Sequence, residues 1–203
     1  MSDVVCPWCF IGEKRLLSAI EESGHEVVLH FHPYDINPGM PREGRERLAH
    51  YEKKFGSLDK LHAMTKALLQ EGAKLGIDYD FDAIKRVPNT LDAHRLIRWA
   101  GSAGVQREVV SALFSAYFEH GKDISHPGVL LDIAAKAGMD VGIVGDLLGT
   151  NRDQDLVQAD IARAQHLGVT GVPTFIFANK FAMVGAQGSD VLAKALDQAA
   201  ALT

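Results

Sequence analysis

The first apolar pattern in the chain is helical and begins near the amino end. Cys9 and Leu16 are separated by seven positions, which places them on one face of a helix over residues 7–22. Pro7 suits the first turn of such a helix, because the N–H that proline lacks would have no helical partner there. The spacing therefore predicts that Cys9 points into the core, whereas Cys6 stays exposed at the tip of the helix.

Other segments alternate in the manner of β-strands. Residues 26–34 mix β-branched and aromatic side chains with polar ones and end at a turn-rich stretch, so we expect a strand there. Residues 174–177 and 181–184 predict the two strands of a hairpin, with residues 178–180 as its turn. A last amphipathic helix follows, with core positions at Leu192, Ala195, Leu196 and Ala199.

Between these segments the pattern is helical from about residue 44 to residue 167. The apolar stripes of the longer helices are Leu61, Met64, Leu68 and Leu75; Ala93, Leu96, Ile97 and Ala100; and Val110, Leu113, Phe114 and Tyr117. Shorter helices are expected over residues 127–137, 141–148 and 153–167. This element order predicts an α/β fold in which residues 37–165 form a large all-helical insertion between residues 1–36 and 166–203.

Composition excludes several classes of partner. The 203 residues are 47% hydrophobic and 23% charged, which is ordinary for a globular protein with a substantial core. The formal net charge of -5 leaves no basic stripe for nucleic acid or for anionic lipid. No apolar run reaches the roughly 18–20 residues of a membrane-spanning helix, and no secretory signal opens the chain. We therefore expect a cytoplasmic protein whose partners are neither nucleic acid nor membrane.

The candidate chemistry lies in the tetrapeptide Cys6-Pro7-Trp8-Cys9. These are the only two cysteines, and because structural disulfides are rare in a reducing cytosol, a catalytic or metal-binding pair is favoured. If Cys6 is the N-cap of the helix, the free N–H groups and the helix dipole should lower its pKa below the usual value of about 8.5. Cys9 would then resolve a mixed disulfide formed at Cys6, which predicts thiol-disulfide exchange.

Zinc binding and a purely structural role are the alternatives for this pair. Zinc normally takes four ligands, and no second C-x-x-C motif is present. The best remaining ligands are His30 and His32, which alternate onto one face of the predicted strand. Histidines on strands more often pack or contact solvent, so we expect no metal. A binding module without catalysis would depend on those two histidines together with Cys6 and Cys9.

Three groups of residues, which together span nearly the whole chain, resemble the motifs of a known family. They are Ser2-Asp3-Val4-Val5-Cys6-Pro7-Trp8-Cys9-Phe10-Ile11-Gly12, Pro88-Asn89-Thr90 with Ala93-His94-Arg95-Leu96, and Gly171-Val172-Pro173-Thr174-Phe175. With them the sequence resembles the DsbA family, specifically its FrnE-like branch, which is related to 2-hydroxychromene-2-carboxylate isomerases and kappa-class glutathione transferases. The resemblance implies a thioredoxin-like fold, βαβ…ββα, interrupted by the helical insertion.

The resemblance also implies further site residues. Taken alone, Pro173 fits the start of a strand and its peptide bond is expected to be trans. The resemblance implies instead that the Val172–Pro173 bond is the cis-proline bond facing the disulfide, with the backbone of Val172 offered to an extended substrate. Pro7 and Trp8 would contribute to the same substrate-binding surface.

Phe10 and His94 are secondary candidates for supporting the site, although a partly buried structural histidine is the ordinary interpretation at position 94. The chain departs from the family pattern in two ways. The first core strand, which usually precedes the Cys6 motif, is almost absent. A second cysteine pair, found in some FrnE-like members, is missing, which excludes a mechanism with a second dithiol relay.

The function implied is that of a protein disulfide oxidase or isomerase, acting on thiol- or disulfide-containing proteins or on small thiols. No cofactor is implied, except that glutathione could serve as a co-substrate. The alternative is a glutathione-dependent isomerase or transferase, in which the helix N-terminus activates the thiol of bound glutathione. Related isomerases and transferases commonly carry serine at the position of Cys6. The sequence does not fix the substrate, the direction of electron flow or the oligomeric state.

Overall fold

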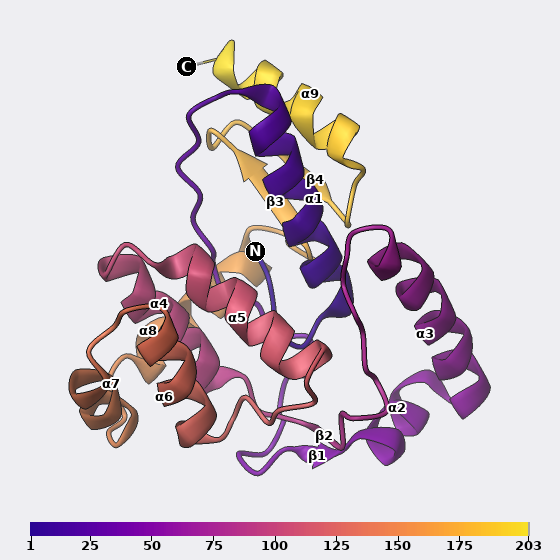
Figure 1. The fold of residues 1–203 in the computed structure, drawn as a ribbon, viewed down its shortest axis with the longest axis vertical. Helices are drawn as coiled ribbons and strands as arrows, with labels where there is room; N and C mark the ends of the chain where they lie inside the picture. The colour runs from indigo at the N-terminus through magenta and orange to yellow at the C-terminus, as the bar shows by residue number, and fades with distance from the viewer. Residues whose placement is uncertain (203) are drawn as a thin grey trace.

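The computed structural model describes residues 1–202 and is dominated by helices (Figure 1). The helices are α1 (Pro7–Ser23), α2 (Arg47–Phe55), α3 (Leu58–Ala73), α4 (Leu91–Ser102), α5 (Gln106–Phe118), α6 (Pro127–Lys136), α7 (Val141–Leu148), α8 (Gln154–His166) and α9 (Ser189–Ala200). The strands are β1 (Arg45–Glu46), β2 (Arg86–Val87), β3 (Thr174–Phe177) and β4 (Phe181–Val184). Within residues 1–202, no helix combines the length and the apolar character needed to cross a bilayer.

Helix α1 connects the two hydrophobic cores of the molecule. Its amino-terminal part, with Cys9, Phe10 and Ile11, is buried in a large core shared with the helical insertion. Further along, Leu16 and Ala19 pack into a smaller core with β3 and α9. Figure 1 shows α9 lying alongside α1, with the β3–β4 hairpin beside both. The helix therefore fixes the position of the cysteine motif relative to both halves of the chain.

The carboxyl-terminal hairpin and helix confirm the sequence prediction. Strands β3 and β4 are antiparallel, in register from Thr174 opposite Val184 to Phe177 opposite Phe181. The turn places Ala178 in the left-handed region with φ 48°, as tight hairpins require. Along α9 the predicted apolar positions are buried against α1, because they recur at helical spacing.

The insertion is helical at the predicted positions, and α6, α7 and α8 agree closely with the expected bounds. The expectation that it is wholly helical is wrong in one detail. The short strands β1 and β2 form a two-residue antiparallel ladder, with Arg45 opposite Val87. Ladders of this length leave no periodic signal in the sequence. The division into residues 37–165 and two flanking segments stays a prediction.

The strand predicted over residues 26–34 is wrong, because this stretch is extended but belongs to no ladder. A single parallel bridge joins Ser2 to Pro33. In it, the N–H of Ser2 donates to the carbonyl of His32 at 3.0 Å, and the N–H of Tyr34 donates to the carbonyl of Ser2 at 2.9 Å. A strand forms hydrogen bonds with a neighbouring segment along its whole length. The short segment before α1 pairs with residues 26–34 near their carboxyl end alone, at Pro33.

Candidate active site

Cys6 is the N-cap residue of α1, as the sequence predicts, with φ -94° and ψ 111°. Its carbonyl accepts the backbone N–H of Cys9 at 3.0 Å and that of Phe10 at 3.4 Å, which closes the first turn. Pro7 occupies the first helical turn. The side chain of Cys6 makes no capping hydrogen bond to the helix. The cysteine pair is therefore one turn apart at a helix start, and both residues are free thiols.

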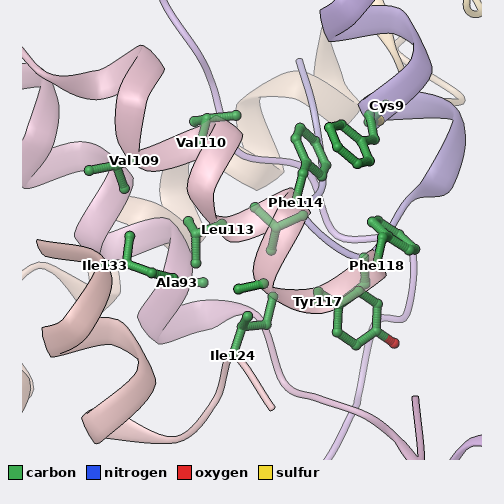
Figure 2. Close-up of a cluster of buried hydrophobic side chains, with 14 of the residues drawn as sticks. Cys9, Ala93, Val109, Val110, Leu113, Phe114, Tyr117, Phe118, Ile124 and Ile133 are labelled. Atoms are coloured by element: carbon green, nitrogen blue, oxygen red, sulfur yellow. The ribbon is translucent and has the colours of Figure 1, made fainter. Parts of the chain in front are cut away.

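The predicted difference in exposure between the two thiols is wrong. Cys6 is 6% exposed and Cys9 is 2% exposed, so both are buried. Cys9 points into the large core, and Figure 2 shows it at the margin of the cluster formed by Phe114, Phe118 and other side chains of α5. Cys6 is covered because the chain folds over the start of α1 from segments remote in sequence, which helical spacing does not reveal.

The expected lowering of the pKa of Cys6 is also contradicted. The hydrogen bond with the Cys9 side chain raises the pKa of Cys6 well above its usual value, and burial and the negative charge of Cys9 raise it further. The carboxylate of Asp3 adds to the same effect. Two adjacent sulfurs share a proton readily, but a second negative charge beside the first is costly. In the reduced protein Cys6 is therefore held as a thiol near neutral pH.

The loop before β3 lies against this pair. The Val172–Pro173 peptide bond is cis, and the thiol of Cys6 donates to the carbonyl oxygen of Val172 at 3.7 Å. Downstream, the carbonyl of Pro173 accepts the N–H of Gly185 at 2.8 Å, which fixes the loop to the end of β4. The fold brings Cys6 and Val172 together, although 166 positions separate them in the sequence. This contact joins predicted site residues from the two ends of the chain.

Gly12 determines how closely α1 approaches this loop. A Cβ atom at position 12 would lie 2.9 Å from Cγ of Pro173 and 3.1 Å from Cζ of Phe175. Both distances are shorter than real Cβ contacts normally allow. The absence of a side chain therefore lets the helix and the loop pack directly together.

We expect the Gly12→Ala variant to be less stable by about 1–2 kcal/mol, because overpacking outweighs the helix propensity gained from alanine. Urea denaturation measures the change. The matched control is Gly145→Ala in α7, where the nearest atom would be Leu131 Cδ2 at 3.8 Å. That variant should gain about 0.5–1 kcal/mol. Equal responses of the two variants would contradict the close packing at Gly12.

Tyr79 was not identified from the sequence and lies beside the cysteine motif. Its hydroxyl donates to the backbone carbonyl of Pro7 at 2.7 Å, which holds the first turn of α1 from the insertion side. Burial raises the pKa of Tyr79, and the nearby sulfurs of Cys6 and Cys9 raise it further. The tyrosine is therefore neutral and a lasting hydrogen-bond donor. An isolated aromatic residue 72 positions away carries no local signal of this contact.

Phe10 and Trp8, on either side of Cys9, differ in burial. Phe10 is buried and stacks on Phe114 with ring centroids 5.2 Å apart, while Tyr79 meets it edge-on at 5.9 Å. It is therefore part of the large core beside Cys9. Trp8 is only partly buried and packs against the same core. Trp8 thus keeps some surface beside the cysteines.

His94 is buried beneath the segment that leads to Cys6. Its Nε2 atom lies 3.1 Å from the carbonyl oxygen of Tyr34 and 3.5 Å from Oδ1 of Asp3. Asp3 is fully buried, and its other carboxylate oxygen accepts the N–H of Ile36 at 2.8 Å. His94 and Asp3 together join the start of the chain to the segment at residues 34–36. His94 therefore contacts the segment before Cys6 through Asp3.

Glu13 follows Cys9 by one helical turn and is almost fully buried. One carboxylate oxygen accepts a short hydrogen bond from the hydroxyl of Ser111 on α5. Its other oxygen, Oε2, has no hydrogen-bond partner within residues 1–202. Burial raises the pKa of Glu13 from 4.5 to about 7. The carboxyl group is therefore protonated below neutrality in the folded protein.

This shift predicts a pH-dependent stability. Above about pH 4.5 the unfolded chain loses the Glu13 proton while the folded chain keeps it, so stability falls as the pH rises to about 7 and stays low beyond. The Glu13→Gln variant should be more stable than the wild type by about 2–3 kcal/mol at pH 8 and nearly equal at pH 4. Urea denaturation at both pH values measures this. Glu21→Gln, at an exposed position, is the control and should show no such pH dependence.

A cavity of about 240 Å³ opens next to Val5, the residue before Cys6. Its lining includes the polar side chains of Asp35, Asn37 and Asn89. Asn37 is buried, and its Nδ2 amide has no hydrogen-bond partner within the described chain. The cavity therefore offers polar groups to a small ligand beside the cysteine motif.

The zinc alternative gains no support from the placement of its ligands. Among residues 1–202, no three histidine, cysteine, aspartate or glutamate side chains are grouped closely enough to hold a metal ion. Burial lowers the pKa of His32. His126 is the N-cap of α6, and its ring accepts the N–H of Gly128 at 3.2 Å.

Paired thiols at the start of a helix, a cis-proline loop against them, and a hairpin and helix behind define a thioredoxin-like protein. The chain belongs to the DSBA-like thioredoxin domain family, whose model matches residues 1–197. This confirms the DsbA resemblance and the thioredoxin-like fold with its helical insertion. Members of this family are DsbA-like thiol oxidoreductases.

Individual relatives agree with this assignment. The chain is similar to the structure of a probable DsbA oxidoreductase, SCO1869, from Streptomyces coelicolor, with a TM-score of 0.88 and 29% identity over 100% of this chain and 88% of that one. The uncharacterized protein YwbO of Bacillus subtilis (strain 168) is 26% identical over 96% of this chain and 92% of its own length. A 2-hydroxychromene-2-carboxylate isomerase shares the fold, with a TM-score of 0.74 and 18% identity over 100% of this chain and 97% of that one.

Proposed function

We propose that this protein is a thiol-disulfide oxidoreductase that cycles between a Cys6–Cys9 dithiol and a Cys6–Cys9 disulfide. The observation that carries the proposal is the pair of free thiols one turn apart at the start of α1, with the Cys6 sulfur 3.7 Å from the Val172 carbonyl. In this fold class the sulfur beside the cis-proline loop is the one that meets a substrate. Val172 and Pro173, with the partly exposed Trp8 and Pro7, would form the contact surface.

The cycle follows from thiol-disulfide exchange. The thiolate of Cys6 attacks one sulfur of a substrate disulfide, which forms a mixed disulfide and releases one substrate thiolate. Cys9 then attacks the sulfur of Cys6, which forms the Cys6–Cys9 disulfide and releases the second substrate thiolate. Two electrons pass from the dithiol to the substrate. Run in reverse, the same steps oxidise a substrate dithiol.

The raised pKa of Cys6 bears on the direction of electron flow. A stabilised thiolate favours the reduced enzyme and makes its disulfide oxidising, as in DsbA itself. Here the hydrogen bond with Cys9 and burial raise the pKa of Cys6, so the thiolate is not favoured. We therefore propose that the dithiol acts as a reductant or isomerase more readily than as an oxidase. A reducing compartment such as the cytoplasm would suit this direction.

Glutathione is the proposed co-substrate that returns the enzyme to its dithiol form. One glutathione thiolate would open the Cys6–Cys9 disulfide by attacking Cys6, which releases the Cys9 thiolate. A second would attack the glutathione sulfur of that mixed disulfide, which releases the Cys6 thiolate and yields oxidised glutathione. The polar cavity beside Val5, with the unpartnered amide of Asn37, supports the binding of a small peptide-like thiol near the site. Proteins and small molecules that carry disulfides remain the proposed substrates.

Trapping of the mixed disulfide tests the proposal. Cys9→Ser removes the resolving thiol, so the variant should accumulate a covalent adduct at Cys6 when it is treated with oxidised glutathione or a disulfide-bonded protein. Intact-mass measurement and peptide mapping would find one adduct per chain, removable by reductant. Cys6→Ser is the control and should form none. A folded Cys9→Ser protein that forms no adduct would contradict the proposal.

The same variants test the alternative, a glutathione-dependent isomerase or transferase. That activity depends on the thiol of bound glutathione and not on a protein cysteine. It would therefore survive in Cys6→Ser and require added glutathione, whereas disulfide exchange would be lost. Assays of the Cys6→Ser variant for both activities separate the two functions.

A further inference from the structure

Helix α2 carries two basic side chains and a tyrosine on one face. Arg47, Tyr51 and Lys54 are separated by four and three positions, so they lie one above another along the helix. We call these three residues the basic face of α2. In Figure 1, α2 lies beyond the amino-terminal end of α1, which is the end that carries the cysteine motif.

Lys54 joins one end of the basic face to the backbone beside Cys6. Its ammonium group donates to the carbonyl of Ile36 at 2.9 Å and to Oδ1 of Asn37 at 2.7 Å. The N–H of Ile36 donates to the Asp3 carboxylate at 2.8 Å, and the backbone carbonyl of Asp3 accepts the N–H of Cys6 at 3.0 Å. Burial lowers the pKa of Lys54, while the negative charges of Asp3 and Cys6 act to raise it. Lys54 is therefore within electrostatic reach of the Cys6 sulfur.

Arg47 connects the other end of the basic face to the same helical turn. Its guanidinium carbon lies 5.6 Å from the centroid of the Phe81 ring, and this ring stacks on that of Tyr79 with centroids 4.8 Å apart. The hydroxyl of Tyr79 donates to the carbonyl of Pro7 at 2.7 Å. Both ends of the basic face are thus linked to the turn at which α1 begins.

Arg47 is a buried cation without an anion. The residue is 7% exposed, yet its guanidinium makes no hydrogen bond and no ion pair within residues 1–202. The rings of Tyr51 and Phe81 lie at 5.7 and 5.6 Å from it. Aromatic faces attract a cation, but they supply no acceptor for the five N–H donors of the guanidinium. The neighbouring carboxylate of Glu46 is already used, because it caps the amino end of α2.

A second buried arginine shows what a structural role for such a side chain looks like. The guanidinium of Arg95 donates to three backbone carbonyls and to one carboxylate oxygen, so its charge is fully bound within the fold. Burial of a charged group is costly when its hydrogen bonds are not replaced. The guanidinium of Arg47 therefore has the character of a receptor whose acceptors come from a ligand.

Tyr51 adds an uncharged donor between the two cations. Its hydroxyl has no hydrogen-bond partner in the part of the chain that the structure describes. Burial raises the pKa of Tyr51 to about 12, the charge of Arg47 lowers it, and that of Cys6 raises it. The hydroxyl therefore keeps its proton at neutral pH, and it is within electrostatic reach of both Arg47 and Cys6.

We propose that the basic face of α2 binds a carboxylate of the substrate, with Arg47 as the receptor, while Cys6 bonds to the substrate sulfur. The proposal rests on the thiol-disulfide exchange proposed above and specifies its substrate class as small disulfides that carry a carboxylate. A planar guanidinium offers two parallel donors to a carboxylate, and the hydroxyl of Tyr51 offers a third. The small size follows from Cys6, which is 6% exposed and can be reached only by a slender molecule.

Two disulfides of matched length test the proposal in the Cys9→Ser protein, where the adduct at Cys6 accumulates. Dithiodipropionate carries two carboxylates, and bis(hydroxypropyl) disulfide is its uncharged counterpart. In each reaction the Cys6 thiolate bonds to one substrate sulfur, and the other half of the disulfide leaves as a thiolate. Adduct formation is followed by intact mass. Each rate is divided by the rate of the same disulfide with dithiothreitol, which removes differences in intrinsic reactivity.

The dianionic disulfide should react about 10- to 100-fold faster on this scale, which is the range expected of one hydrogen bond to a charged group. The net charge of -5 repels a dianion from the protein as a whole. A preference for dithiodipropionate therefore requires a local cation beside Cys6.

Arg47→Met identifies that cation, because methionine keeps apolar contact with the two rings. Added to Cys9→Ser, it should abolish the preference for dithiodipropionate and leave the rate with the uncharged disulfide unchanged. The matched control is Arg45→Met, which removes the same charge from an exposed position of β1. This control should keep the preference. A preference that survives in Arg47→Met, or that falls equally in both variants, would overturn the role of Arg47.

Salt dependence provides a test that does not require the Arg47→Met variant to fold. Raising the ionic strength from about 0.01 M to about 1 M shortens the screening length about tenfold, so the preference of the Cys9→Ser protein should shrink. Equal normalised rates of the two disulfides at low salt would overturn the proposed substrate class while leaving thiol-disulfide exchange intact. Failure of both disulfides to form any adduct would instead contradict the exchange reaction itself.

Discussion

Alkylation of Cys6 in the reduced protein is expected to accelerate about 100-fold between pH 7 and pH 9, because the thiolate is the reactive species and its fraction rises tenfold per pH unit below the pKa. The hydrogen bond with Cys9, together with burial, raises the pKa of Cys6 well above 9.0. A thiolate stabilised by the helix start, as the sequence suggests, would instead react at a nearly constant rate above neutrality. Rates measured with iodoacetamide, assigned to Cys6 by peptide mapping, distinguish the two.

Cys9→Ser is the informative companion variant. It removes the Cys9 sulfur, whose hydrogen bond with the Cys6 side chain is the largest cause of the raised pKa of Cys6. Alkylation of Cys6 at pH 7 should therefore be faster in Cys9→Ser than in the wild type, and its pH profile should level off earlier. Burial of Cys6 slows every rate but leaves the slope with pH unchanged. A wild-type profile that is flat from pH 7 to pH 9 would contradict the raised pKa.

The parts of the fold that the sequence predicts well are those set by local spacing. The hairpin of residues 174–184 is marked by two short apolar runs around a three-residue turn, and α7 by its own apolar period, so both are found at the expected positions. The extended stretch at residues 26–34 has the right side chains for a strand. It belongs to no ladder because pairing depends on a second segment, and the residues before α1 pair with it at Pro33 alone.

The site is predicted less completely, because its environment comes from distant residues. The helix start at Cys6 is readable from Pro7 and the apolar spacing. The contact of Cys6 with Val172 is not, and neither is the hydrogen bond from Tyr79 to Pro7. Nor does the sequence reveal that Glu13 is buried against Ser111, 98 positions away. These distant contacts determine the exposure of Cys6 and the protonation of Glu13, which the local sequence pattern alone does not reveal.

Replacing Arg95 by leucine is expected to lower the free energy of unfolding by about 4 kcal/mol. Arg95 lies in residues 93–96, one of the segments that resemble the DsbA family, and its side chain is fully buried. Its guanidinium donates to the backbone carbonyls of Leu147, Thr150 and Arg152 at 2.6, 2.9 and 2.7 Å. It also binds Asp92 Oδ1 at 2.7 Å. Leucine would remove the guanidinium donors from the Thr150 and Arg152 carbonyls and from Asp92 Oδ1, whereas the Leu147 carbonyl keeps the hydroxyl of Thr150 as a donor.

The charge at position 95 therefore joins α4 to the loop between α7 and α8, and its role is structural. The melting temperature of Arg95→Leu should fall by about 8–16 °C. The control is Arg98→Leu on the same helix, whose side chain is 41% exposed and pairs with Asp160 at 3.0 Å. An exposed pair contributes about 1 kcal/mol at most, so that variant should melt within about 4 °C of the wild type. Thermal unfolding by circular dichroism compares them, and similar losses in both would show that Arg95 does not hold the loop.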